Sequence, residues 1–335
     1  MVLPNLGGPD GPESVQPFLR NLFRDPAIIQ APFLIREGLA WLISTLRGKS
    51  ARANYAKMGG GSPLLPGTIK QADALKTLLE DEHSDLDVRV FPAMRYWHPF
   101  TEEVVAKIKD WGPDQTVILP LYPQFSTTTT GSSLTAWKNA GGGAAQSVCC
   151  YPTEENFLGA HKELIEKAWS DAGRPENVRV LLSAHGLPEK IVEAGDPYPW
   201  QVKQTAEKLM ADLPQFGDWQ ICYQSRVGPM KWISPSTDDS IIQAGEDGKH
   251  ILLVPIAFVS EHIETLVELD EEYALLAEQN GVLGYTRVPA LGTHSLFIKS
   301  LGKIVMSVIG TEQGLRPGCE GLKCPSDRRG CPHNK

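Results

Sequence analysis

The feature that most constrains the fold is an apolar segment followed at once by a charged one. Residues 251–259 read ILLVPIAFV, an unbroken apolar run that is short enough for a strand buried on both faces of a parallel sheet. Residues 260–270 then place three glutamates at helical spacing among apolar positions, with Ser260 as a candidate N-cap. We therefore expect a strand whose exit loop delivers His262 and several carboxylates to the crevice where α/β proteins bind ligands. Acidic residues in a first helical turn can also simply complement the helix dipole.

The same alternation of strand and helix recurs along the chain. The sequence predicts strands at 88–94, 116–122, 178–183, 219–223 and 284–288, and helices at 13–30, 32–47, 68–80, 101–110, 154–171, 198–212 and 294–309. Such alternation is typical of parallel sheets covered by helices, so we expect two similar α/β domains facing a cleft. A Gly-rich and Cys-bearing hinge at 139–152 sets the boundary: domains at 1–152 and 153–312, and a cysteine-bearing tail at 313–335.

Charge and hydropathy exclude two classes of protein. The formal net charge of −8 over 335 residues argues against nucleic acid as a partner, because phosphate binding needs concentrated Lys and Arg. No apolar run reaches the roughly 18 residues of a transmembrane helix, and no signal peptide opens the sequence. We therefore expect a cytoplasmic protein, in which clustered cysteines indicate metal binding before disulfides.

One predicted helix carries more apolar surface than a single core contact needs. Residues 32–47 place four apolar side chains on one face and two more about a quarter-turn away: Ile35, Leu39, Leu42 and Leu46, then Leu34 and Trp41. A well-buried helix explains this pattern. An exposed apolar surface that contacts a membrane or an apolar ligand explains it equally well.

The predicted strand exits collect chemically active side chains. They carry His98, His185, His262 and Glu264, with Arg95, Tyr96 and Trp232 in the same class of position. A single histidine after a strand is more often structural than catalytic. Several imidazoles and carboxylates in one crevice can take up protons near neutral pH or pass on a divalent ion, and the aromatic rings suit a large flat ligand.

Seven separated blocks of sequence together resemble the ferrochelatase family, which inserts ferrous iron into a porphyrin in haem synthesis. The blocks, in order, are NLGGP from residue 5, GGGSP from 59, RYWHP from 95, SAHGLP from 183, GDPYP from 195, QSRVGP from 224 and PIAFVSEHIETL from 255. The resemblance runs from residue 1 to about residue 310. It implies two Rossmann-like domains of the chelatase type, each with a parallel four-stranded sheet flanked by helices.

The resemblance implies roles for the residues in these blocks. His185 is similar to the active-site histidine of the family, and Glu264 to its paired acidic residue. We expect His185 to accept pyrrole protons and to contact the iron, with Glu264 and Glu268 as an acidic relay on one helix face and His262 supporting the same rim.

A second set of positions resembles the porphyrin pocket of the family. Arg95 suits a propionate, and aromatic rings suit the macrocycle. The set comprises Arg95, Tyr96, Ser132 and Trp232, with Tyr55 and Ser62 as weaker candidates. In the family, the segment near residues 33–46 belongs to the pocket lip, which favours peripheral membrane contact.

The tail brings three cysteines, Cys319, Cys324 and Cys331, among Gly, Pro and Arg. It resembles the arrangement in ferrochelatases that hold a two-iron two-sulfur (2Fe-2S) cluster on three tail cysteines and one from the body of the chain, although its spacing differs from that of the animal enzymes. Such clusters normally take four thiolates, and the resemblance implies Cys149 or Cys150 as the fourth. Cys222 lies within a predicted buried strand. A zinc ion on four thiolates is the alternative.

The sequence thus predicts a lyase that joins ferrous iron to protoporphyrin IX. A coproporphyrin III chelatase and a non-catalytic protein that binds haem or an iron–sulfur cluster on the same scaffold are the alternatives. Other divalent ions such as zinc or cobalt are also chemically reasonable substrates. The sequence leaves open whether the protein is a monomer or a homodimer, from which side iron enters, and whether the cluster is structural or sensory.

Overall fold

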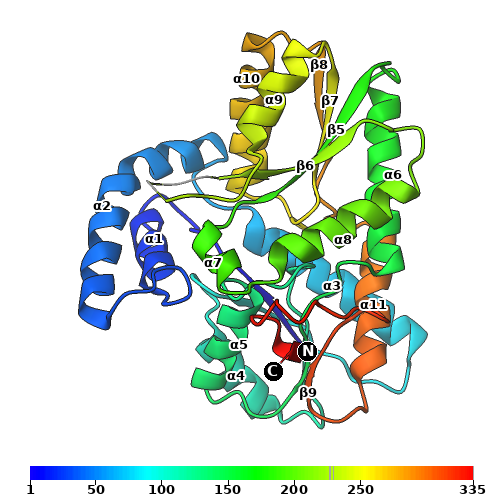
Figure 1. The fold of residues 1–335 in the computed structure, drawn as a ribbon. Coiled ribbons are helices and arrows are strands. Elements are labelled where there is room, and N and C mark those ends of the chain that lie inside the picture. Colours follow the sequence, from blue (N-terminus) through cyan, green and yellow to red (C-terminus); the bar gives the residue numbers. More distant parts are fainter. Residues whose placement is uncertain (226–227, 229, 335) are drawn as a thin grey trace. The chain divides into compact units, whose positions relative to one another are not determined.

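The computed structural model describes residues 1–225, 228 and 230–334, and it divides into two compact units (Figure 1). The first unit comprises Met1–Cys150 and Leu301–Gly318, and the second comprises Tyr151–Ser300 and Cys319–Lys335. The chain first passes between the units at Cys150, close to the expected boundary at residue 152. Residues 301–318, which the sequence analysis placed in the second domain and the tail, pack instead with the first unit.

The first unit is built on a parallel sheet of five strands, in the order β2-β1-β3-β4-β9. Its strands are β1 (Val2–Asn5), β2 (Phe91–Met94), β3 (Val117–Ile118), β4 (Gln146–Val148) and β9 (Gly314–Arg316). The expected sheet had four strands. The fifth, β9, comes from the segment after the last long helix and pairs with β4, which lies inside the stretch interpreted as a hinge.

Helices cover both faces of this sheet: α3 (Leu64–Glu82), α4 (Thr101–Trp111), α5 (Thr130–Asn139) and the second half of α11 (Ser295–Val308). Two further helices of the unit, α1 (Val15–Arg24) and α2 (Phe33–Lys57), pack against each other. On one face, α4 and α5 bury Val104, Ile108 and Trp137 against Val2 and Ile118. On the other face α3 meets α11, so closely that a Cβ at Gly302 would lie 2.9 Å from Leu78 Cδ2.

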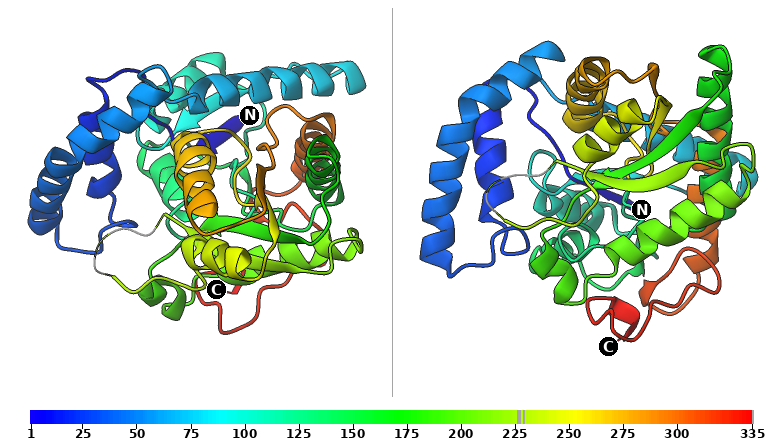
Figure 2. Two further views of the ribbon diagram at one scale, coloured as in Figure 1. Left: turned by 90° about the horizontal axis from the view of Figure 1, so that it is seen from above. Right: turned by 45° about the horizontal axis from the view of Figure 1, so that its top comes forward.

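Helix α2 is longer than expected and exposes an apolar face. It lies alongside α1 in every view (Figure 2). Leu34 and Leu46 are 80% and 70% exposed, and Trp41 is 56% exposed. We call this surface the α2 apolar face; it consists of Phe33, Leu34, Ile35, Leu39, Trp41, Leu42 and Leu46. Of the two explanations from the sequence, the structure therefore supports the exposed surface. In the described parts of the chain, no helix is long and apolar enough to cross a membrane.

The second unit contains the expected parallel four-stranded sheet, in the order β6-β5-β7-β8. Its strands are β5 (Val178–His185), β6 (Trp219–Gln224), β7 (His250–Pro255) and β8 (Gly284–Arg287). The central strands β5 and β7 are buried on both faces, as the apolar runs predicted. The register pairs His185 at the end of β5 with Gln224 at the end of β6. His185 and the start of the QSRVGP block therefore reach the same sheet edge.

The helices of this unit are α6 (Glu155–Asp171), α7 (Glu189–Glu193), α8 (Tyr198–Ala211), α9 (Thr237–Glu246), the π-helix η1 (Glu264–Glu272), α10 (Tyr273–Gln279) and the first half of α11, with a short 3₁₀ turn η2 (Pro332–Asn334). The π-helix, α9 and α10 share a core with the sheet. Leu269, Tyr273 and Ile241 pack there against Leu181 and Leu253.

The helix after β7 differs from the expectation in two ways. It is a π-helix, with Tyr273 N–H donating to Glu268 C=O five residues earlier. It also begins later than predicted, because Ser260 does not cap it. Instead Thr265 Oγ1 accepts a hydrogen bond from His262 N–H at 2.9 Å. Because the helix begins at Glu264 rather than directly after Ser260, His262 lies in the loop before the helix.

A buried histidine outside the strand exits gives the second unit a pH-dependent stability. His161 in α6 is fully buried, and neither ring nitrogen meets a hydrogen-bond partner among the described residues. Burial, and then the nearby His294, lower the pKa of His161 to about 3. Below about pH 6.5, His161 is therefore protonated in the unfolded chain, whereas in the folded chain it stays neutral down to about pH 3.

We expect the wild-type protein to lose stability as the pH falls from about 6.5 towards 3, and His161→Leu to remove part of that loss. At pH about 4.5, two units below the ordinary pKa of histidine, His161 should lower the free energy of unfolding by about 2–3 kcal/mol. Unfolding of both proteins in denaturant at pH about 7 and about 4.5 measures it. An equal loss of stability in the two proteins would contradict this assignment.

Candidate active site

His185 is the last residue of β5 and is held by its own loop. Its Nδ1 lies 2.6 Å from the carbonyl oxygen of Gly186, and because a carbonyl can only accept, Nδ1 carries the hydrogen. The lone pair of the neutral ring is therefore on Nε2, which faces Glu264 Oε1 at 3.6 Å. Trp232 packs beside this turn, since a Cβ at Gly186 would lie 3.2 Å from its ring.

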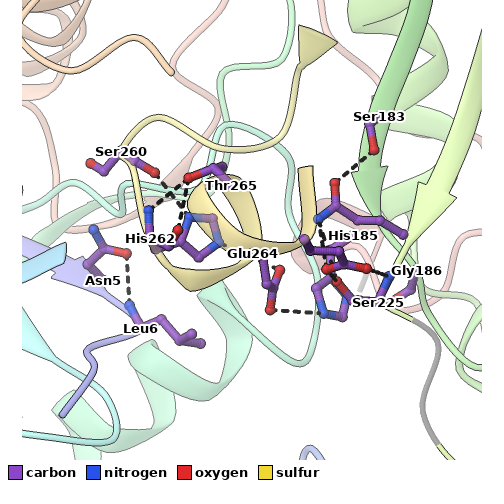
Figure 3. A network of polar contacts seen from close by, with 12 residues as sticks. Asn5, Leu6, Ser183, His185, Gly186, Ser225, Ser260, His262, Glu264 and Thr265 are labelled. Atoms are coloured by element: carbon purple, nitrogen blue, oxygen red, sulfur yellow. Dashed lines mark hydrogen bonds and ion pairs between the residues drawn. The ribbon is translucent and has the colours of Figure 1, made fainter. Parts of the chain in front are cut away.

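His262 is arranged in the same way from the opposite side. Its Nδ1 lies 3.2 Å from the carbonyl oxygen of Ser260, and its Nε2 lies 3.6 Å from Glu264 Oε2. Figure 3 shows the Glu264 carboxylate between the two imidazole rings. Two basic nitrogens and one carboxylate thus converge, with the histidine side chains 39% and 9% exposed.

The two carboxylates of the π-helix have their pKa values moved in opposite directions. Burial alone would raise the pKa of Glu264, but the charges of His185 and His262 and hydrogen bonds from His262 and Ser225 outweigh it and lower the pKa to about 2. Burial, and then the charge of Glu264, raise the pKa of Glu268. Carboxylates separated in this way suit one ionised and one proton-carrying role.

Glu268 is held by the end of β6. Its Oε1 accepts from Ser225 N–H at 2.8 Å, and its Oε2 accepts from Ser225 Oγ at 2.5 Å and from Gln224 Nε2 at 3.3 Å. The Gln224 amide is oriented by Ser183 Oγ, which donates to its Oε1 at 2.7 Å. The expected shared face of Glu264 and Glu268 therefore forms, on a π-helix.

Ser225 and Tyr198 belong to this site and were not assigned by the sequence analysis. Ser225 has a φ of +62°, a left-handed conformation that is costly without glycine. Tyr198 is buried, which raises its pKa, and it hydrogen-bonds with the backbone of His185. Both lie within motifs that were recognised, but only the folded chain shows which of their side chains face inward. Arg226, Val227 and Pro229 of the QSRVGP block lie outside the described residues.

Glu261 holds the loop rather than facing the imidazoles. Its Oε1 accepts from Arg287 Nη1 at 2.6 Å and from Ala290 N–H at 2.9 Å. The same guanidinium binds Asp270 of the π-helix through Nε and Nη2, at 2.6–2.7 Å. Arg287 therefore fixes the loop that carries His262 to the helix that carries Glu264.

In the first unit, three expected porphyrin contacts surround one buried carboxylate. Asp25, which follows α1 and is 4% exposed, binds Arg95 Nη2 at 2.9 Å and Tyr96 OH at 2.8 Å, and it also accepts from Ser132 Oγ. Arg95 Nε donates to Ser132 Oγ at 2.7 Å. Burial, and then the charge of Asp25, raise the pKa of Tyr96 well above its usual range. The sequence analysis did not identify Asp25, which lies in an ordinary Asp-Pro turn.

The two weaker candidates lie at and after the end of α2. Tyr55 is buried, and its carbonyl accepts from Gly60 N–H at 2.9 Å. Ser62 follows in the glycine loop and donates its N–H to Pro9 C=O at 2.7 Å. A Cβ at Gly8 would lie 2.4 Å from Ser62 Cβ, so only glycine allows these two loops to meet.

The six cysteines are thiols rather than disulfides. Cys149 and Cys150 follow β4 in the first unit with their Sγ atoms 3.0 Å apart, whereas Cys319, Cys324 and Cys331 belong to the second. The tail folds against the second unit, where Gly330 N–H donates to Gly195 C=O at 2.9 Å and Gln201 Nε2 lies 3.4 Å from Cys324 Sγ. Within the described residues, no three His, Cys, Asp or Glu side chains are grouped so that they could hold a metal ion.

Comparison with known proteins gives one consistent family. The family model described as Ferrochelatase matches residues 1–309. Proteins named ferrochelatase from Hyphomonas neptunium and Caulobacter vibrioides are each 57% identical to this chain, over 99% of it and 94% and 96% of their own lengths. One from Pelagibacter ubique is 45% identical over 99% of this chain and 97% of its own. Among solved structures, CbiX, the terminal enzyme of sirohaem biosynthesis in denitrifying bacteria, aligns with a TM-score of 0.51 and 15% identity over 74% of this chain and 94% of its own, a likeness of fold alone.

Proposed function

Because this chain belongs to the ferrochelatase family, we propose that it inserts ferrous iron into protoporphyrin IX to form protohaem, the last step of haem biosynthesis. The reaction is that of a lyase: two pyrrole N–H bonds break, iron–nitrogen bonds form and two protons leave. One observation carries the assignment of the site: the ionised Glu264 lies 3.6 Å from the Nε2 atoms of both His185 and His262.

We propose His185 as the first proton acceptor. Its Nδ1–H is fixed on a carbonyl, so the Nε2 lone pair is available to a pyrrole N–H, and the imidazolium that forms is stabilised by Glu264 beside it. The same two groups are our candidates for iron contact, because an imidazole nitrogen and a carboxylate both suit ferrous iron. His262 supports Glu264 from the other side, and Glu268 receives the proton next.

We propose that the Asp25 cluster of the first unit binds a porphyrin propionate through Arg95. Ser132 and Asp25 already engage Nε and Nη2 of the guanidinium, so the two N–H groups on Nη1 and the second one on Nη2 are left for the propionate. Tyr96, Ser132, Tyr55, Ser62 and Trp232 remain our candidates for the rest of the porphyrin pocket. Asp25 was not among these candidates; it would orient Arg95 rather than contact the porphyrin.

The substrate is tested by an anaerobic assay with ferrous iron and either protoporphyrin IX or coproporphyrin III. We expect haem absorption to develop with protoporphyrin IX. Activity with coproporphyrin III alone would move the function to a coproporphyrin chelatase. Binding of a porphyrin without insertion of iron would support the non-catalytic alternative.

We also propose that Cys319, Cys324 and Cys331 hold a 2Fe-2S cluster with Cys149 or Cys150. Four thiolates are the usual ligands of such a cluster. The three clustered cysteines of the tail, together with one from the body of the chain, supply that number and so support the proposal. Among the described residues, no three such side chains are grouped as a metal site, so the proposal rests on the cysteine pattern alone. Protein purified anaerobically should show the visible absorption of a cluster, and Cys324→Ser should lose it. Stoichiometric zinc without that absorption would favour the zinc alternative.

We further propose that the protein works on the cytoplasmic side of the membrane and touches it through the α2 apolar face. Seven exposed apolar side chains on one helix support this, and with a net charge of −8 the contact would depend on apolar area rather than on anionic lipid. Flotation with neutral phosphatidylcholine vesicles should carry the wild-type protein but not Leu34→Glu/Leu46→Glu. Equal flotation of both would overturn the contact.

A further inference from the structure

We propose that Tyr273 and Asp238 form the exit route by which protons released during iron insertion pass from Glu268 to solvent. The inference rests on the proposed roles of His185, Glu264 and Glu268. It adds two residues from elements outside the recognised motifs: Tyr273 opens α10, and Asp238 lies in the first turn of α9.

The first link joins the two carboxylates of the π-helix. Ser225 Oγ donates to Glu268 Oε2 at 2.5 Å, and the same side chain lies close enough to Glu264 to help lower the pKa of that carboxyl group. A hydroxyl placed between two carboxylates can accept a proton from one and give its own to the other. Ser225 therefore connects the group between the imidazoles to the group behind it.

The second link leads away from the imidazoles. Tyr273 OH lies 3.0 Å from Glu268 Oε1 and 3.4 Å from Asp238 Oδ2. The tyrosine is only 5% exposed, so its hydroxyl position is set by packing in the core with Leu269 and Ile241. Asp238 itself is exposed, in the first turn of α9, so its carboxylate is open to water.

The chemistry of the contacts around Glu268 gives the route its direction. Of its four partners, Ser225 N–H and Gln224 Nε2 are donors that cannot accept a proton. The hydroxyls of Ser225 and Tyr273 can both accept and donate. A proton that enters from Ser225 therefore leaves through Tyr273.

The transfer balances without a tyrosinate. The proton arrives on Oε2 of Glu268, and rotation of the carboxyl group brings it to the Tyr273 side. Glu268 then gives this proton to the Tyr273 oxygen while Tyr273 gives its own proton to the Asp238 carboxylate. Asp238 then releases the proton to water, and rotation of the Tyr273 hydroxyl restores the starting state. Burial, and then the charges of Glu268 and Asp238, raise the pKa of Tyr273, which agrees with a hydroxyl that stays neutral throughout.

Tyr273→Phe tests this route, and Tyr285→Phe is its matched control. Both changes remove one hydroxyl from a tyrosine packed in the same core as the π-helix, Tyr273 buried and Tyr285 half-buried. Tyr285 OH, however, donates to the carbonyl of Leu269 at 2.7 Å, and a carbonyl cannot pass a proton on. We expect the single-turnover rate of iron insertion to fall by about 10-fold or more in Tyr273→Phe, as for the loss of a proton-transfer group. We expect Tyr285→Phe to keep the wild-type rate and both variants to keep the wild-type affinity for protoporphyrin IX.

Asp238→Asn gives an independent reading at an exposed position, where loss of folding is not a concern. It should slow single-turnover insertion in the same way and add nothing to the loss in Tyr273→Phe, and both variants should show a larger solvent deuterium isotope effect than the wild type. Wild-type rates in both Tyr273→Phe and Asp238→Asn would overturn the route. If His185→Ala also inserted iron at the wild-type rate, the proposed site itself would be wrong.

Discussion

Replacing His185 with alanine should reduce the rate of iron insertion by about 10³-fold, within the range expected for the loss of a general base. The reason is geometric. Nδ1 is fixed on the Gly186 carbonyl, so Nε2 is the basic nitrogen, and it points at Glu264. Alanine removes the acceptor and leaves the ionised Glu264 with His262 as its remaining imidazole partner. The measurement is haem formation under anaerobic conditions.

The control for this prediction is His294→Ala. His294 lies in the same unit and also pairs with a glutamate, Glu163, at 3.2 Å, but outside the candidate site. We expect it to keep the wild-type rate of insertion. Because His185 is 39% exposed, added imidazole should enter the space left by alanine and restore part of the activity. Full activity of His185→Ala without imidazole would remove His185 from the mechanism.

The apolar run at 251–259 predicted a buried parallel strand, because a continuous apolar run is typical of a strand covered on both faces. β7 confirms this over 251–255, whereas residues 256–259 lie in the loop after the strand. The helix after it was harder to predict. Apolar spacing cannot separate an α-helix from a π-helix over nine residues, since both leave Glu264 and Glu268 on one side. The start of the helix was also missed: Ser260 has the residue type of an N-cap, but the helix begins after Ile263 without a side-chain cap.

Long-range partners were beyond the sequence for a different physical reason. Asp25 is a turn residue after a helix. Its place in the site follows from its contacts with Arg95, Tyr96 and Ser132, which lie at least 70 residues away along the chain. The strand β9 has three residues and one apolar side chain, so only its pairing with β4 identifies it. Residue identity predicts local periodicity well, whereas contacts between distant short segments depend on the assembled core.

Within the candidate site, the sequence predicted which residue types would be present. It did not predict how their side chains would be oriented. His185, His262 and Glu264 were all expected at strand exits. The two imidazoles turn their Nε2 atoms to opposite sides of one carboxylate because the backbone carbonyls of Gly186 and Ser260 hold their Nδ1 atoms. Every residue has a backbone carbonyl, so the sequence could not show which ones would do this. The arrangement makes the charge on Glu264 the feature that both histidines share.

Glu264→Gln should therefore reduce iron insertion by at least about 10²-fold, although the side chain keeps its size. The neighbouring imidazoles of His185 and His262 lower the pKa of Glu264 to about 2, so the wild-type carboxyl group is ionised near neutral pH. The glutamine amide cannot stabilise an imidazolium by charge. Its NH₂ would also donate to one Nε2 and occupy the lone pair that takes the pyrrole proton. Single-turnover insertion with ferrous iron and protoporphyrin IX measures the loss.

Two further variants separate charge from structure in this prediction. Glu163→Gln removes a carboxylate that lies 3.2 Å from His294 in the same unit, and it should leave insertion unchanged because Glu163 makes this contact outside the His185–Glu264–His262 group. Glu264→Asp keeps the charge but moves it away from the imidazoles, so its rate should fall between those of the wild type and Glu264→Gln. If Glu264→Gln inserted iron as fast as Glu163→Gln, a charged acceptor between the two histidines would not be needed. Proton removal would then depend on the imidazoles alone.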